Sequence, residues 1–252
     1  MRYLDEFRDP ARARGLLRRI RAVARRPLRL MEFCGTHTHA IFRHGIRQLL
    51  PPTITMLSGP GCPVCVTSAA DLDRAVALAG LPGTILATFG DMLRVPGSRG
   101  SLQAARAAGA DVRVIYSSLD ALEIARKEPA RTVLLLGVGF ETTAPTIAAA
   151  LLQAENEGLE NLRVYSLHKL TPPATAAILQ AGEVALDGIL APGHVSAIIG
   201  SSAWEFVARD FHLPCTVAGF EPLDILQGIA DLVEQREAGL NQIALFEPAA
   251  TG

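Results

Sequence analysis

The sequence of 252 residues is poor in cysteine and in long apolar runs, and each shortage excludes a class of protein. Four cysteines in a chain of this length do not form the disulfide framework that stabilises small secreted domains. The apolar segment at residues 75–90 is interrupted by Gly80, Pro82 and Gly83, and it is too short to span a bilayer. No low-complexity tract occurs, and 49% hydrophobic with 19% charged residues is typical of a soluble globular protein.

The basic N-terminus is the main departure from this ordinary composition. Residues 1–29 hold ten Arg against three acids, a local net charge of +7 in a chain whose net charge is −1. Apolar residues recur there at helical spacing, which favours an amphipathic surface helix over a nucleic-acid-binding arm or a transit peptide. A secretory signal would need an apolar core of about 7 or more residues, which this segment lacks. We therefore expect a cytoplasmic protein that binds neither nucleic acid nor membrane.

Runs rich in Val, Ile and Leu alternate with Ala-rich segments of helical length, which is typical of repeated βα units and a parallel sheet. Eight strands are predicted, at residues 28–33, 53–58, 83–89, 111–116, 131–138, 162–167, 186–191 and 214–220. The length is compatible with a closed (β/α)8 barrel or with two four-stranded open sheets. For two sheets, the charged "RKEPAR" at residues 126–131 suggests a boundary, with domains at residues 1–128 and 129–252.

The unusual residues follow directly on predicted strands, so they are expected at the carboxyl edge of a sheet. In parallel α/β folds, ligands bind at that edge because helix N-termini converge there with free N–H groups. The segments concerned are "CGTHTH", "GPGCPVC", "GDMLRVPGS", "GFETTAP", "HKLTPPA", "PGHVS" and "GFEPLD".

Cys34 is a candidate reactive thiol, because it starts the turn after the first predicted strand. A thiolate at the start of a helix is stabilised by the helix dipole, which makes it a better nucleophile or metal ligand. His37 and His39 follow within five residues and favour metal chemistry over a merely buried cysteine.

Cys62 and Cys65 have two interpretations of similar weight. They could form a redox-active dithiol pair, since a Cys-x-x-Cys loop permits a bridge. They could equally complete a tetrahedral zinc site with Cys34 and His37. Cys215, which precedes an apolar run, is expected in the core.

The remaining candidates are polar residues of the other loops. They are His194 and Glu141 as catalytic residues, and Gly61, Asp91 and Arg94 as residues that bind a cofactor. Together with His168 and Lys169 they would surround the thiols if the loops converge at one sheet edge. A nucleotide site is not expected, because "GVGFET" lacks the third Gly of a dinucleotide fingerprint and no Walker-type loop occurs.

Several long motifs resemble the HypD family, the iron-cofactor assembly scaffold of [NiFe] hydrogenase maturation. The matching segments are "YLDEFRDP", "MEFCGTHTHAIFRHGIRQLLP", "GPGCPVCVT", "TFGDMLRVPGSRGSL", "GFETTAPT", "PGHVSAIIG" and "AGFEPLDILQ". The resemblance implies two similar α/β domains, each a parallel sheet flanked by helices, rather than a closed barrel.

The resemblance also implies roles for individual residues. Cys34 would hold an iron that carries cyanide and carbon monoxide, the Fe(CN)2CO unit, together with a cysteine of a HypC-like partner. His37 would assist, Cys62 and Cys65 would be a redox-active pair, and a HypE-like partner would deliver the cyanide. The protein is thus expected to be an assembly scaffold more than an enzyme.

The resemblance to the HypD family ends before the C-terminal cysteine-rich segment of that family. That segment binds a [4Fe-4S] cluster in the family, and this sequence has no cysteine after Cys215. The cluster is therefore expected for the family but without its ligands here. A thiol-disulfide oxidoreductase and a structural zinc protein remain the alternative functions.

Overall fold

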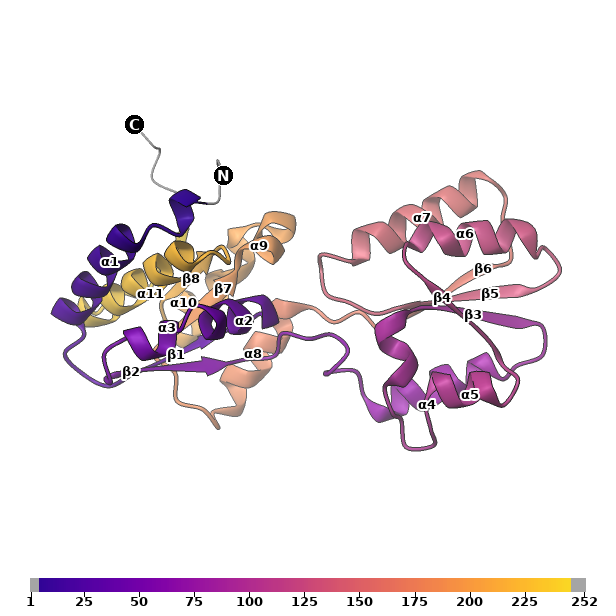
Figure 1. Ribbon diagram of the computed structural model, residues 1–252, viewed down its shortest axis with the longest axis horizontal. Helices are drawn as coiled ribbons and strands as arrows, with labels where there is room; N and C mark the ends of the chain where they lie inside the picture. The colour runs from indigo at the N-terminus through magenta and orange to yellow at the C-terminus, as the bar shows by residue number, and fades with distance from the viewer. Residues whose placement is uncertain (1–4, 246–252) are drawn as a thin grey trace. The chain divides into compact units, whose positions relative to one another are not determined.

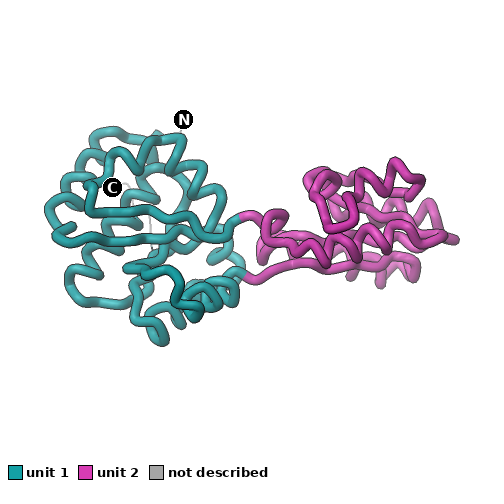
Figure 2. The backbone as a smooth tube through the Cα atoms, turned by 90° about the horizontal axis from the view of Figure 1, so that it is seen from below, with its two compact units in different colours: residues 1–61, 171–252 teal, residues 62–170 magenta. Residues whose placement is uncertain are grey.

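The computed structural model describes residues 5–245 and divides into two compact units, each built on its own parallel sheet. Unit 1 comprises residues 1–61 and 171–252, and unit 2 comprises residues 62–170. The chain therefore passes between the units twice, after Gly61 and after Leu170 (Figure 2). Unit 2 is an insertion between two segments of unit 1.

Unit 1 contains a five-stranded parallel sheet in the order β2-β1-β7-β8-β9. Its strands are β1 (Leu28–Glu32), β2 (Ile54–Ser58), β7 (Gly188–Pro192), β8 (Cys215–Ala218) and β9 (Ile243–Leu245). Its helices are η1 (Asp5–Phe7), α1 (Pro10–Val23), α2 (Gly35–Arg43), α3 (Ile46–Leu49), α8 (Thr171–Ala181), α9 (Gly193–Ile199), η3 (Ser201–Trp204), α10 (Glu205–Phe211) and α11 (Pro222–Glu237).

Unit 2 contains a four-stranded parallel sheet in the order β4-β3-β5-β6. Its strands are β3 (Thr84–Phe89), β4 (Asp111–Ile115), β5 (Thr132–Gly137) and β6 (Leu162–Ser166). Its helices are α4 (Ala69–Ala79), η2 (Gly90–Arg94), α5 (Leu102–Ala107), α6 (Ser118–Lys127) and α7 (Ala144–Asn156). Helices α6 and α7 cover one face of this sheet, and α4 and α5 cover the other (Figure 1).

Both sheets are covered on two faces, which explains why strands β3, β5, β7 and β8 are almost continuously apolar. In β5, Val133 and Leu135 join the core under α6 and α7, while Leu134 and Leu136 join the core under α4 and α5. This alternation is the two-residue period of a strand. Each sheet therefore needs helices on both sides, and the α/β alternation of the sequence supplies them.

The N-terminal helix α1 packs along α11 with the amphipathic pattern that the sequence predicts (Figure 1). Leu17 and Ile20 are buried, whereas Arg19 pairs with Glu234 on α11. The arginines of α1 therefore form an outer face with ion pairs on one flank. Along residues 5–245, no helix has the length and apolarity that crossing a bilayer would require.

The predicted fold class is confirmed: two similar α/β domains, each a parallel sheet flanked by helices. All eight predicted strands are present, and the short edge strand β9 is an addition.

The two units do not coincide with the domains expected from the sequence, which divide at residues 128 and 129. Residues 128–131 connect α6 to β5, and β5 pairs with β3, so a boundary there would cut a continuous sheet. Strands β7 and β8 return to pair beside β1 instead.

Candidate functional site

Cys34 is the N-cap residue of α2, immediately beyond the carboxyl end of β1. Its Sγ accepts a hydrogen bond from the backbone N–H of Thr36 at 3.4 Å, and the residue is only 7% exposed. The free N–H groups and the dipole of the helix favour negative charge at this position. The thiol thus lies at the start of a helix directly after a strand, which is where the sequence places it.

Glu32, the last residue of β1, supports the turn that carries Cys34. The side chain is buried, with one carboxyl oxygen accepting from the backbone N–H of Cys34 at 3.0 Å and the other from the Thr38 hydroxyl. Burial raises the pKa of Glu32, and the hydrogen bonds from Thr38 and Cys34 oppose that rise. The sequence analysis did not assign a role to Glu32. The signal that could have identified it is an acidic residue at the end of a mainly apolar strand.

His37 lies one helical turn after Cys34 and is completely buried. Its Nε2 is 2.8 Å from the carbonyl oxygen of Gly219, and because a carbonyl can only accept, Nε2 carries the proton. The other ring nitrogen, Nδ1, is buried and has no hydrogen-bond partner among residues 5–245. Burial lowers the pKa of His37 to about 4, so the ring is neutral near pH 7 and Nδ1 offers a lone pair.

His194 belongs to the same sheet edge as His37. The ring of Phe220 contacts both imidazoles, with centroid distances of 4.7 Å to His37 and 5.0 Å to His194. These residues follow β1, β7 and β8, which are neighbours in the sheet. A Cβ on Gly193 would lie 2.8 Å from the carbonyl oxygen of Ala218, so only Gly permits this approach of two loops. Sequence reasoning had not assigned a role to Phe220.

Gly61 packs backbone to backbone against the Cys34 turn. A Cβ on Gly61 would lie 2.2 Å from the backbone nitrogen of Gly35 and 2.7 Å from the carbonyl carbon of Cys34. These distances leave no room for a side chain. Close packing therefore explains why position 61 is a glycine. The predicted role of Gly61 in binding a cofactor stays a prediction.

Cys62 and Cys65 lie in the turn that precedes α4, at the start of unit 2. Both are free thiols, with their sulfur atoms 2.7 Å apart and the backbone N–H of Cys65 donating to the sulfur of Cys62 at 3.3 Å. The hydrogen bond to Cys62 raises the pKa of Cys65. Cys65 is exposed, so the pair is accessible to a reaction partner.

The predicted site residues are divided between two sheets, so they do not share one sheet edge. Cys34, His37 and His194 belong to unit 1, while Asp91, Arg94 and Glu141 belong to unit 2. Asp91 and Arg94 lie in η2 after β3, and Glu141 is buried in the loop after β5. The division follows from strand pairing, because β3 and β5 pair with each other and not with β1.

Cys215 is a core residue, as predicted. It lies in β8 with no exposed surface, and burial raises the pKa of its thiol. Within residues 5–245, no three His, Cys, Asp or Glu side chains are grouped as ligands of one metal ion.

Comparison with known proteins agrees with the motif resemblance. The HypD model, described as "Hydrogenase formation hypA family", matches residues 11–246. The chain is 48% identical to the hydrogenase maturation factor HypD of Rhodobacter capsulatus, over 98% of this chain and 69% of that protein. It is 46% identical to HypD of Escherichia coli K12 (96% of this chain, 67% of that protein) and 51% identical to HypD of Azotobacter vinelandii (96% and 66%). The chain belongs to the HypD family.

The HypD match extends across both units and includes every residue of the Cys34 turn and of the Cys62–Cys65 turn. This chain spans about two thirds of the length of the HypD proteins compared above. The family membership inferred from the motifs is therefore confirmed, and the sequence-based site residues lie within the matched region.

Proposed function

We propose that this HypD-family chain is an assembly scaffold that holds an iron fragment at Cys34 during hydrogenase maturation. The observation that carries the proposal is a helix-capping thiol in the same turn of α2 as the buried Nδ1 of His37, which has no hydrogen-bond partner among residues 5–245. The relatives are named hydrogenase maturation factors, and these names support the assignment of this chain to hydrogenase maturation.

The chemistry of the Cys34 turn suits such a fragment. The substrate is an iron that carries cyanide and carbon monoxide, and a soft thiolate is a favourable ligand for it. Cys34 would bind after losing its proton, and the N-terminus of α2 would stabilise the negative charge of both the thiolate and the cyanides. His37, neutral near pH 7, would accept a hydrogen bond or donate its Nδ1 lone pair without adding charge.

Cys62 and Cys65 would supply reducing equivalents. When two thiols form a disulfide, they release two electrons and two protons, and the 2.7 Å between these sulfurs requires little movement of the turn. The same distance is the observation that favours the second candidate function, thiol-disulfide exchange with a protein substrate.

The partners proposed are those of the family resemblance. A HypC-like small protein would share the iron through its own cysteine, and a HypE-like protein would deliver cyanide. A [4Fe-4S] cluster usually takes four Cys thiolates, and core burial keeps Cys215 out of such a set. We therefore assign no cluster to the four cysteines of this chain.

Anaerobic purification with infrared spectroscopy and metal analysis tests the scaffold. We expect iron together with bands of cyanide and carbon monoxide, and we expect Cys34→Ser to lose both. Serine supplies an N-cap oxygen in place of the Cys34 sulfur, so α2 should remain folded. The matched control is Cys215→Ala, which also removes one thiol and should retain the iron. Stoichiometric zinc, or iron that persists in Cys34→Ser, would contradict the proposal.

A further inference from the structure

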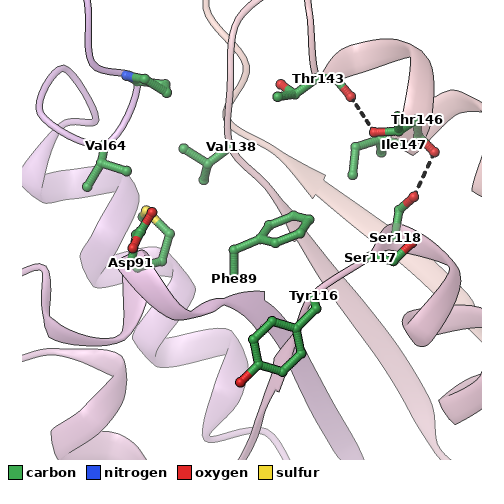
Figure 3. A pocket seen from close by; sticks show the side chains of 12 residues that line it. Val64, Phe89, Asp91, Tyr116, Ser117, Ser118, Val138, Thr143, Thr146 and Ile147 are labelled. Carbon is green, nitrogen blue, oxygen red and sulfur yellow. Dashed lines mark hydrogen bonds between the residues drawn. The ribbon is translucent and has the colours of Figure 1, made fainter. Parts of the chain in front are cut away.

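Unit 2 contains a cavity of about 410 Å³ beside the Cys62–Cys65 turn (Figure 3). The carboxyl ends of β3, β4 and β5 and the first turns of α6 and α7 surround it. Its size lies within the range of ~300–1,000 Å³ that is typical of ligand sites. Its walls are mainly apolar, with side chains of Val64, Phe89, Val138 and Ile147.

One wall of the cavity is the segment that joins the two thiols. Pro63 and Val64, the residues between Cys62 and Cys65, both line it. A group bound against this wall would contact the Cys-x-x-Cys turn itself. In thiol-disulfide exchange the partner's sulfur must reach one of the two thiols, so residues next to the partner's sulfur would lie against this wall.

The polar groups of the cavity indicate the charge of its occupant. Asp91 is the one charged residue in the lining, and within residues 5–245 its carboxylate has neither a hydrogen bond nor an ion pair. The nearby hydroxyls are already engaged, since Ser118 donates to the Thr146 carbonyl and Thr146 donates to the Thr143 carbonyl, each at 2.9 Å (Figure 3). The cavity therefore has mainly apolar walls and one negatively charged group, the carboxylate of Asp91.

We propose that this cavity docks a Lys or Arg side chain next to the reactive cysteine of a thiol partner protein. The aliphatic stem would pack on Val64 and Val138, as long basic side chains commonly pack on apolar surface, and the charged end would pair with Asp91. Tyr116, which is 91% exposed at the rim, would cover the neighbouring peptide segment. The inference rests on the redox role that we propose for Cys62 and Cys65.

The exchange that docking would serve is balanced in atoms and electrons. The thiolate of one cysteine of the pair attacks a partner disulfide, forming a mixed disulfide while the partner's second sulfur leaves as a thiolate and takes up a proton. The remaining cysteine, after losing its proton, attacks its neighbour's sulfur in the mixed disulfide. The products are the Cys62–Cys65 disulfide and a reduced partner, with two electrons and two protons transferred.

Peptide binding tests the docking separately from the redox chemistry. The probes are two fluorescent peptides of identical length, one with Arg and one with Glu beside a Ser that replaces the cysteine. Fluorescence anisotropy with the reduced full chain should show tighter binding of the Arg peptide. Partly exposed charge pairs contribute modestly, so we expect Asp91→Asn to reduce the Arg preference by about two- to fivefold.

Two further variants make the result decisive. Glu155→Gln, which removes an exposed acid near the other end of α7, should leave the preference unchanged. Tyr116→Ala should weaken both peptides alike, because it removes apolar contact and no charge. Equal binding of the two peptides, or an Arg preference that survives Asp91→Asn, overturns the proposal.

Exchange with a small neutral disulfide separates the two hypotheses. If the pair reduces 2-hydroxyethyl disulfide but the peptides bind without preference, the docking inference fails and the redox role stands. If the pair does not react but the Arg preference depends on Asp91, the cavity is a docking site and the redox role fails.

Discussion

At the scale of single residues, buried polar groups organise the Cys34 turn. Glu32 accepts the backbone N–H of Cys34, and the carbonyl of Gly219 fixes which nitrogen of His37 carries the proton. A buried polar atom without a hydrogen-bond partner lowers stability, and within the described part of the chain the Nδ1 of His37 is such an atom. Such atoms are typical of sites that acquire a partner when they bind.

His37 should make the stability of the protein depend on pH in a defined window. Unfolded His37 takes up a proton near its ordinary pKa of 6.5, whereas the folded residue does so only near a pKa of about 4. The unfolded state therefore binds more protons between these values, and stability falls as the pH is lowered from about 6.5 to about 4. Urea unfolding at pH 7 and pH 4.5 should show a loss of about 2–3 kcal/mol from this residue.

The matched variant is His37→Gln, whose side-chain amide can still donate to the Gly219 carbonyl. Between pH 7 and pH 4.5 this variant should lose about 2–3 kcal/mol less stability than the unchanged chain, because the contribution of His37 is absent. Equal pH dependence in the two proteins would show that His37 is protonated in the folded state more easily than its burial implies.

At the scale of elements, glycines let loops from different strands approach the site. Gly61 lies against the Cys34 turn and Gly193 lies against the end of β8, both at distances that exclude a Cβ. These contacts connect the loop after β2 with the loop after β1, and the loop after β7 with that after β8. The arrangement of these loops at the carboxyl edge of the unit 1 sheet therefore depends on glycine at positions 61 and 193.

Gly61→Ala should destabilise the protein by about 1–3 kcal/mol, because the added methyl group must displace backbone and not a flexible side chain. Denaturant unfolding measures the effect. Gly15→Ala is the control, since a Cβ there meets nothing nearer than a side-chain nitrogen of Arg18 at 4.0 Å in the middle of α1. It should stabilise the chain by about 0.5–1 kcal/mol. Equal effects of the two substitutions would mean that the close approach of Gly61 is not maintained.

At the scale of the whole molecule, the chain is one α/β unit inserted into another. Residues 62–170 have their own sheet and two cores of their own, on either face of it. The inserted unit is about the size of a typical small domain and has apolar cores of its own, so we expect it to fold alone.

Residues 62–170, expressed by themselves, should therefore fold cooperatively. Circular dichroism should show mixed helix and strand content with a single thermal transition, and amide NMR signals should be well dispersed. The Cys62–Cys65 pair should remain titratable as two thiols, because both sulfurs lie within the unit. Poor dispersion and a gradual transition would show that unit 2 requires contacts with unit 1.

The local elements were determined by the sequence itself. The eight predicted strands, the amphipathic helix α1 and the placement of Cys34 and the Cys62–Cys65 turn directly after strands all follow from short-range periodicity and turn residues. Cys215 was predicted in the core on the same grounds. The HypD resemblance added the expectation of two open sheets.

The pairing of strands was decided only by the tertiary structure. Which strands share a sheet depends on contacts between segments far apart in the chain, so β7 and β8 join β1 across the whole of unit 2, and no local pattern shows it. That pairing brings His194 and Phe220 to His37, and it leaves Asp91 and Glu141 on the other sheet. A local period determines the faces of a strand, whereas its neighbours in the sheet depend on the packing of the complete chain.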